Sequence, residues 1–294
     1  PIVKTGAING KETWSAARIY ELQGRVVVDA GDTLIVEPGT IIKANSGQGA
    51  YASALIVAQG GYMEAKGTAF APIIMTSVFD DIEAGELYGS NLDETDAGLW
   101  GGLIVLGNAS ISADAVPSRI EGIPANETYG FYGGSDDSDN SGIFEYISIR
   151  HGGTLLGEGN EINGLTLGGV GSGTTLDHIE VVSNLDDGIE FFGGTASITN
   201  ALVAFAGDDS FDWDQGYRGA NNANWLAIQD QPNGIGDRGG ELDGDDSDDG
   251  NVSADEMPFS TPSVTGWTVV SAGNNQGFLF RNGSGGNVTN ALIT

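Results

Sequence analysis

The sequence of 294 residues contains no cysteine and only 11 basic residues, against 41 acidic ones. Without cysteine the chain forms no disulfide bond and no thiolate metal site. The net charge of −30 repels phosphate backbones and anionic membranes, so nucleic acid is excluded as a partner. No run of about 18 apolar residues exists, so we expect no transmembrane helix. Bound cations would relieve the charge, and aspartate oxygens are ligands that calcium prefers.

Proline is also scarce, at 8 residues, whereas glycine is abundant at 48. Glycine costs about 1 kcal/mol against alanine in a helix interior, so long helices are not expected. There is no Gly-X-Y period, which excludes collagen. Short apolar runs separated by glycine and Asn or Asp indicate short strands joined by tight turns.

The second half of the sequence is repetitive, with a period of about 22 residues, which is a length typical of solenoid repeats. The order acid, acid, small, apolar, acid, aromatic occupies residues 186–191 and again 208–213. The apolar strand before it, at 179–182, recurs at 201–204. One coil of a parallel β-helix takes about 20–25 residues, and its strands stack about 4.8 Å from those of the next coil. The period predicts an all-β, right-handed parallel β-helix with coils of about 22 residues.

The repeat continues toward the end of the chain. Trp225 begins an apolar run one period after Val203, and residues 278–280 fall where the next acidic and aromatic segment is due. We expect one solenoid domain over residues 1–294, with no linker that would divide it. Three long segments interrupt the pattern and are expected to be loop excursions, where function concentrates: 79–98, 108–142 and 231–262.

The third excursion contains a twelve-residue pattern typical of a calcium loop, at residues 245–256. Oxygen donors occupy positions one, three and five, glycine occupies position six, and a glutamate occupies position twelve as the bidentate ligand. Flanking helices are not expected, because the preceding segment is rich in glycine and Pro258 follows closely. A solvated acidic loop is the alternative. The predicted calcium ligands are Asp245, Ser247, Asp249, Asn251, Ser253 and Glu256.

A second acidic segment, residues 136–142, is a weaker calcium candidate. Asp137 and Asp139 would be its ligands. The segment lacks a glutamate at position twelve, although Glu145 is nearby.

A third candidate is an acidic column. The period of the sequence stacks Asp186 on Asp208, Asp187 on Asp209, and Glu190 on Asp212. Like charges stacked about 5 Å apart are costly unless an ion bridges them or a proton is shared. Three interpretations are open for this column: aspartates that cap turns, a calcium ladder, or a catalytic carboxylate pair.

An enzyme is the alternative to a structural, adhesive or glycan-binding protein, because polysaccharide lyases and glycoside hydrolases commonly use this fold. A lyase needs a basic residue beside calcium. The best basic cluster is 150–153, which we interpret as a strand end with a buried His151. A hydrolase needs paired carboxylates, which Asp187, Asp208 and Asp209 would supply.

Aromatic residues are numerous around the acidic column. Strand alternation lets only one of Phe191 and Phe192 face the core. We expect Trp213, Tyr217 and Trp225 to fill the coil rather than to bind sugar rings.

The sequence resembles right-handed β-helix surface proteins and lipoproteins of marine and environmental bacteria. Five segments carry the resemblance: 98–107, 148–153, 160–171, 186–194 and 207–212. It implies a β-helix and export to the cell surface or the extracellular medium, but no particular activity. The chain opens at Pro1 without a charged, apolar leader, so we expect an export leader to have been removed or to lie outside this sequence.

These observations predict an exported, calcium-stabilised β-helix with a structural, adhesive or glycan-binding role. The expected partners are extracellular polysaccharides or other surface proteins. Self-assembly through the open ends of the coils is a further expectation, since unpaired strands at an end can pair with another copy.

Overall fold

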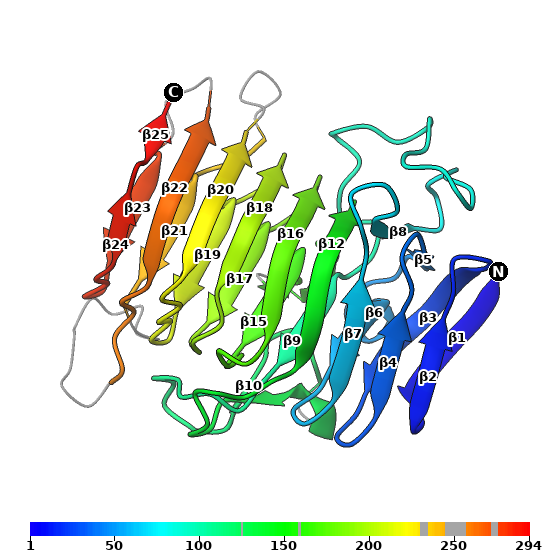
Figure 1. Cartoon of the computed structure of the whole chain (residues 1–294), viewed down its shortest axis with the longest axis horizontal. Helices are drawn as coiled ribbons and strands as arrows, with labels where there is room; N and C mark the ends of the chain where they lie inside the picture. The colour runs from blue at the N-terminus through cyan, green and yellow to red at the C-terminus, as the bar shows by residue number, and fades with distance from the viewer. Residues whose placement is uncertain (125, 158–159, 230–234, 245–256, 272–275) are drawn as a thin grey trace.

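The computed structural model describes residues 1–124, 126–157, 160–229, 235–244, 257–271 and 276–294. Nearly all regular elements are strands, and except for two antiparallel pairs each runs parallel to a strand in the next coil. The coils stack along the long axis, with the N-terminus at one end and the C-terminus at the other (Figure 1). The predicted parallel β-helix is confirmed.

Three faces, A, B and C, surround the core, and each is a stack of parallel strands. Face A contains β2 (Lys11–Trp14), β4 (Thr33–Val36), β7 (Tyr62–Lys66), the first halves of β12 (Gly142–Arg150), β16 (Thr175–Val182), β18 (Ile198–Ala204), β20 (Asn222–Ile228) and β22 (Ser263–Val270), and β24 (Asn287–Thr289).

Face B follows face A around the coil in the long strands. It contains the first halves of β1 (Ile2–Ile8) and β3 (Ile19–Val28), then β5 (Ile41–Ala44), β8 (Ile73–Ser77), the second halves of β12, β16, β18, β20 and β22, and β25 (Leu292–Ile293).

Face C completes the coil. It contains the second halves of β1 and β3, then β6 (Ala54–Val57), β9 (Leu103–Leu106), β15 (Leu165–Gly168), β17 (Ile189–Phe192), β19 (Phe211–Asp214), β21 (Gly240–Asp243) and β23 (Phe278–Arg281). Two antiparallel pairs and two short 3₁₀ helices lie outside the faces: β10 (Ser118–Arg119) with β11 (Phe131–Tyr132), β13 (Leu155–Gly157) with β14 (Asn160–Glu161), η1 (Gly49–Tyr51) and η2 (Thr128–Gly130).

Each long strand bends between face A and face B at one residue with a positive φ. Asparagine tolerates this left-handed conformation, whereas tyrosine and histidine adopt it rarely. The side chains at this corner stack from coil to coil, as shown by the 2.9 Å hydrogen bond from Asn224 Nδ2 to Asn200 Oδ1. The corner residues are Tyr146, His178, Asn200, Asn224 and Gly266.

The core of the later coils is a column of aromatic rings. Phe191 stacks on Tyr217 with ring centroids 4.1 Å apart, and Phe211 stacks on Trp225 at 4.5 Å. All four rings are buried, and each contributes on the order of 2 kcal/mol through removal of its surface from water. Phe192 points outward into a separate cluster. Core filling by these aromatics, with only Phe191 of the adjacent pair facing inward, is confirmed.

The sequence period holds between β17 and β19, where Ile189 pairs with Phe211, but not into the following coil. Trp225 stacks on Ala201 rather than on Val203, so the offset between β18 and β20 is longer than the period. The turn between β17 and β18 spans residues 193–197, whereas the turn between β19 and β20 spans residues 215–221. The additional residues lie in that turn, so the register of the strands is kept.

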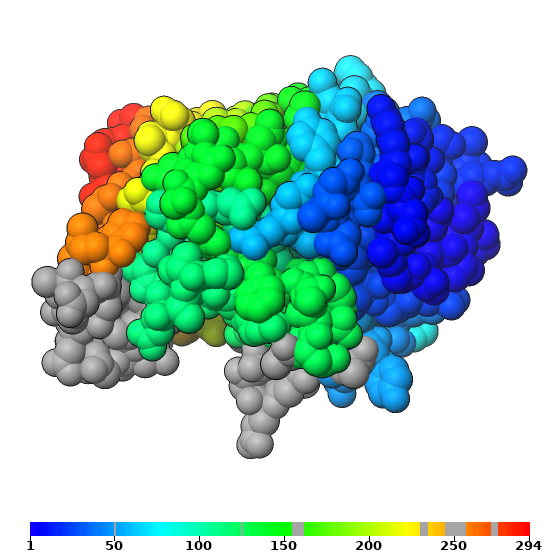
Figure 2. Space-filling view, turned by 90° about the horizontal axis from the view of Figure 1, so that it is seen from below, coloured from blue at the N-terminus to red at the C-terminus, as the bar shows by residue number. Residues whose placement is uncertain are grey.

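The second excursion leaves face C after β9 and returns as β12. Its apolar side chains pack on the outward residues of face C: Ile111, Ile120, Ile123 and Tyr132 lie against Ile104, Leu106 and Phe192. Figure 2 shows this segment, in green and teal, lying across the middle of the solenoid. The excursion therefore covers the outer surface of face C over β6, β9 and β17.

The third excursion, expected over 231–262, contains a regular strand. β21 (Gly240–Asp243) stacks on β19, with Glu241 beside Asp212 and Leu242 beside Trp213. The alternation of Glu241 outward with Leu242 inward is that of a face C strand. The sequence pattern does not indicate this strand, because the strand is short and its flanks are rich in glycine and aspartate.

Candidate functional site: a groove and a buried acidic column

A groove of about 680 Å³ lies over face B. Its floor is made of outward side chains of β12, β16 and β18, including Ser148, Glu180 and Leu202, which are neighbours in the register of the three strands. Its wall is the first excursion, the cyan segment above β8 in Figure 1, and contains Leu87 and Tyr88. The loop insertion thus converts a flat solenoid face into a concave surface.

Aromatic side chains form one edge of the groove. The rings of Tyr146 and His178 stack 4.1 Å apart at an angle of 15°. One coil before Tyr146 the same corner is occupied by Gly67, which has no side chain. Tyr88, on the wall formed by the first excursion, is 77 % exposed. These rings give the groove apolar surfaces within a very acidic protein.

Polar groups occupy the floor. Arg150 Nε donates to Ser148 Oγ at 2.7 Å, and Ser148 Oγ donates to Glu180. The guanidinium lies 3.6 Å from the Glu180 carboxylate and donates to the carbonyl oxygen of Leu87 at 2.8 Å. Arg150 therefore connects the excursion to the coil and orients Glu180.

His151 directly follows the end of β12 and contacts the first excursion. It is 7 % exposed, and its Nδ1 lies 2.6 Å from the carbonyl oxygen of Asp96. A carbonyl can only accept, so this contact requires a proton on Nδ1. Leu99 N–H donates to the His151 carbonyl at 3.0 Å. The cluster at 150–153 is thus a strand end with a buried, hydrogen-bonded histidine, as expected.

Asp177 lies at the corner beside the groove. Burial raises the pKa of its carboxyl, but hydrogen bonds from Thr199, Asn200 and His178 outweigh burial and hold the pKa below its usual value. Thr199 Oγ1 donates at 2.6 Å and Asn200 Nδ2 at 2.8 Å. The carboxylate therefore stabilises the corner in its ionised form.

The acidic column lies at the start of face C and on its outer surface. Glu190 pairs with Asp212 in the register of β17 and β19, as predicted. The turn before β17 places Asp187 below Asp209, and Asp187 Oδ1 accepts a 2.8 Å hydrogen bond from the Asp209 backbone N–H. Capping of a turn is therefore one role of Asp187.

Three sets of carboxylates in this column bring one oxygen of each member to within 4.8 Å of the others. The sets are Asp187, Glu190 and Asp212; Asp186, Asp187 and Asp208; and Asp208, Asp209 and Asp237. These clusters of acidic residues could hold a metal ion.

The electrostatics of the column differ from those of ordinary surface acids. Burial, followed by neighbouring carboxylates, raises the pKa of Asp187, Glu190 and Asp212 far above the usual range. Burial also raises the pKa of Asp209 to about 8, although Arg238 opposes the shift. Burial among like charges therefore disfavours the ionised form of these carboxyl groups unless a cation is bound.

Several buried oxygens in the column have no hydrogen-bond donor among the described residues. They are Oδ1 of Asp209, Oδ1 of Asp212 and Oδ1 of Asn163. Leu165 pairs with Ile189, and Asn163 and Asp187 each lie two residues before these partners, so Asn163 lies one coil below Asp187. The Asn163 Nδ2 donates to Glu190. Sequence reasoning missed Asn163 because it is not acidic, although it occupies the column position one coil earlier.

Access to the predicted catalytic aspartates differs. Asp208 is exposed, but Asp187 is 7 % and Asp209 only 1 % exposed. Neither of these two lines the groove on face B. A polymer in that groove therefore does not reach the set Asp187, Asp208 and Asp209.

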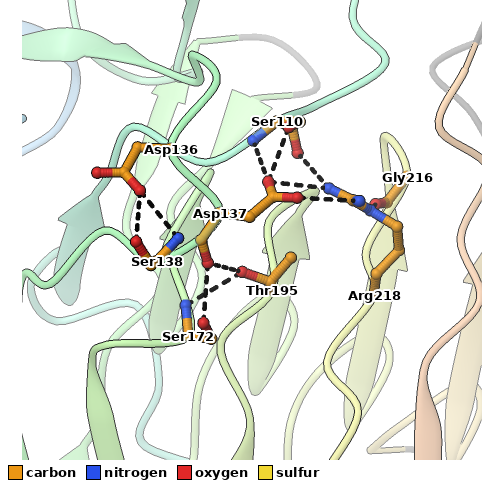
Figure 3. Close-up of polar contacts among 8 residues, drawn as sticks. All are labelled: Ser110, Asp136, Asp137, Ser138, Ser172, Thr195, Gly216 and Arg218. Atoms are coloured by element: carbon orange, nitrogen blue, oxygen red, sulfur yellow. Dashed lines mark hydrogen bonds and ion pairs between the residues drawn. The ribbon is translucent and has the colours of Figure 1, made fainter.

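Asp137, a ligand of the weaker calcium candidate, binds protein groups (Figure 3). Its carboxylate accepts from Ser110 N–H at 2.9 Å and pairs with Arg218 at 3.2 Å. Asp139 Oδ1 accepts from Asn108 at 3.0 Å. Asp137 thus attaches the second excursion to the coil through Arg218, whereas the Asp139 carboxylate binds within the excursion. Among the described residues, neither belongs to a set of acids able to share an ion.

The predicted calcium loop at 245–256 lies outside the described residues, so its ligands Asp245, Ser247, Asp249, Asn251, Ser253 and Glu256 stay a prediction.

Comparison with known families agrees with this geometry. The model of the pectate-lyase-like β-helix domain family matches residues 6–294. The chain belongs to this family. Comparisons with curated proteins and with solved structures found no match. Within the described part of this β-helix domain, no helix is long and apolar enough to cross a membrane.

Proposed function

We propose that this β-helix protein binds a neutral polysaccharide in the groove on face B. The observation that carries the proposal is the stacked pair Tyr146 and His178 beside the polar floor of Arg150 and Glu180. Aromatic rings offer the apolar surface on which a sugar ring packs, and fixed polar groups orient its hydroxyls.

The repeat of the solenoid suits a polymer better than a small ligand. β12, β16 and β18 all contribute to the groove, and stacked strands are about 4.8 Å apart. A chain molecule that lies along the solenoid axis meets a similar surface on successive coils. The family, described as pectate-lyase-like, supports a polysaccharide as the ligand class.

The charges in the groove favour a neutral rather than an acidic polysaccharide. Asp80, Asp93, Glu94 and Glu180 line the groove. Arg150 is already paired with Glu180, and the whole protein has a net charge of −30. A polyanion would therefore be repelled at long range.

Binding without cleavage is favoured over a lyase or a glycoside hydrolase that uses the aspartate column. Hydrolysis requires two carboxyl groups that flank the scissile bond. Asp187 and Asp209 are buried away from the groove, so they do not meet a polymer that lies there.

The test is affinity electrophoresis through gels that contain neutral or acidic polysaccharides, with analysis of released sugars. Tyr146→Asn and His178→Asn remove the rings but keep a residue that suits the corner, because Asn200 and Asn224 adopt the same left-handed conformation. Each variant should weaken binding about tenfold, which corresponds to about 1.4 kcal/mol.

Tyr51→Ala is the matched control, since Tyr51 is 82 % exposed and does not line the groove. Equal retardation of wild type and both groove variants would refute the groove as the binding surface. Tight binding of polyanions alone would refute the ligand class, and released oligosaccharides would show an enzyme.

We also propose that the protein acts at the cell surface or in the extracellular medium, as the resemblance to bacterial surface proteins implies. Fractionation of the producing cells tests this location. Self-assembly through the coil ends stays a prediction, for which light scattering after size exclusion is the measurement.

A further inference from the structure

We propose that Asp187, Glu190 and Asp212 bind a calcium ion at the junction between face C and the turn that precedes it. This site is separate from the groove and does not depend on polysaccharide binding.

The spacing of the three carboxylates fits such an ion. One oxygen of each lies within 4.8 Å of the other two. Calcium binds oxygen ligands at about 2.3–2.6 Å, so oxygens on opposite sides of the ion lie roughly 5 Å apart and adjacent ones lie closer. Carboxylates are hard ligands that calcium prefers. The set therefore satisfies both the geometry and the chemistry of calcium.

A second observation is independent of the acidic charge. Asn163 is 1 % exposed, and its amide nitrogen donates to Glu190, but its Oδ1 has no donor among the described residues. Asp212 Oδ1 and Asp209 Oδ1 are buried without a donor as well. Buried oxygens normally have a partner. A cation can coordinate several oxygens at once, whereas each shared proton joins only two.

The charge balance also favours a cation. Arg238 pairs with Asp209, and Arg281 pairs with Glu241 and Asp243. Within the described residues, no ion pair involves Asp187, Glu190 or Asp212. Burying three carboxylates together without a positive charge is very unfavourable. Arg281 attracts the Asp212 carboxylate through space, but burial and neighbouring acids outweigh it. The strongest charged neighbours of Asp187 and Glu190 are all acids. The set therefore calls for further positive charge.

The position of the site gives an ion a route inward. Asp187 belongs both to the buried set and to the set with Asp186 and Asp208, and Asp208 is exposed. Carboxylates thus lead from the surface to the site, as an access path for a divalent cation requires.

The experiment measures thermal unfolding of chelator-treated protein at pH 7, with and without about 2 mM calcium chloride, a concentration that suits extracellular calcium sites. Wild type is compared with Glu190→Gln combined with Asp212→Asn, and with a control that changes the predicted loop, Asp249→Asn combined with Glu256→Gln. Calcium should raise the wild-type melting temperature by about 5 °C or more, and the column variant should lose at least half of that rise.

A wild-type melt that calcium leaves unchanged would overturn the proposal and would indicate shared protons. The proposal would also be overturned if calcium raised the melting temperature of the column variant as much as that of wild type and only the loop control lost this rise. Should the column variant fail to fold, Glu190→Gln alone is titrated with calcium by calorimetry. Its calcium affinity should be at least about tenfold weaker than that of wild type, and an equal affinity would overturn the proposal.

Discussion

Glu180 and Glu190 have similar local sequences but opposite surroundings. Each follows an inward isoleucine and precedes an inward apolar residue, and each points outward from a stacked strand. The Glu180 side chain is 37 % exposed beside Arg150 in the open groove. Glu190 is only 9 % exposed and has other carboxylates as neighbours.

The difference comes from what lies over each face. The second excursion packs on face C, and Glu121 from that excursion contributes to the raised pKa of Glu190. The first excursion leaves part of face B open as a groove. An outward glutamate is therefore open to the groove on one face and buried among other carboxylates on the other.

The largest expected effect concerns the cover of face C. Ile111 is 4 % exposed in the cluster between the second excursion and face C, so Ile111→Ala should lower the free energy of unfolding by about 3 kcal/mol. The matched change on the open face, Leu202→Ala, should cost about 1 kcal/mol, because Leu202 is only half-buried. Urea unfolding measures both. Equal costs would contradict the distinction between a covered and an open face.

A smaller effect should change sign with calcium. In chelator, Glu190→Gln removes an acid whose ionised form is opposed by burial and by neighbouring carboxylates, so it should raise the free energy of unfolding by about 1–2 kcal/mol, whereas in calcium it should lower it. Glu180→Gln should change stability by less than about 1 kcal/mol in either buffer, since its pair with Arg150 is partly exposed. Calorimetric melts of the two variants, each in chelator and in calcium, test this. If Glu190→Gln changed the free energy of unfolding in the same direction in both buffers, the calcium site would be contradicted.

The smallest effect is a pH dependence on the open side. The pKa of Asp177 is lowered in the folded protein, so its contribution to stability is present above its unfolded value of 3.8 and is lost as the pH falls through the folded pKa. Asp177→Asn should therefore destabilise the protein by less than about 1 kcal/mol at pH 7, and this deficit should shrink as the pH falls below 3.8. Melts between pH 7 and pH 2, with the exposed Asp114→Asn as control, measure the difference. A deficit that persists undiminished at pH 2 would rule out the carboxylate as its cause.

The sequence predicts the solenoid well because each coil requires apolar residues at the same inward positions. Inward residues such as Val181 and Val203 must be apolar in every coil, so the period is visible without a structure. The stack of Glu190 on Asp212 follows from the same register. By contrast, the longer offset to Trp225 depends on a turn length that no core position constrains.

The groove could not be predicted, because it depends on where an excursion folds back. Neither Tyr88 nor Leu87 carries a periodic signal that relates it to Tyr146 or Glu180. The burial of Asp187 depends on the same kind of packing. A sequence pattern shows which side of a strand a residue occupies, but not whether a distant loop covers that side.

The most direct test of the central claim is a crystal structure of the protein grown with a lanthanide in place of calcium, with the anomalous scattering recorded. The account predicts an anomalous peak about 2.3–2.6 Å from carboxylate oxygens of Asp187, Glu190 and Asp212. Absence of a peak there, with these carboxyl groups hydrogen-bonded to one another, would contradict it.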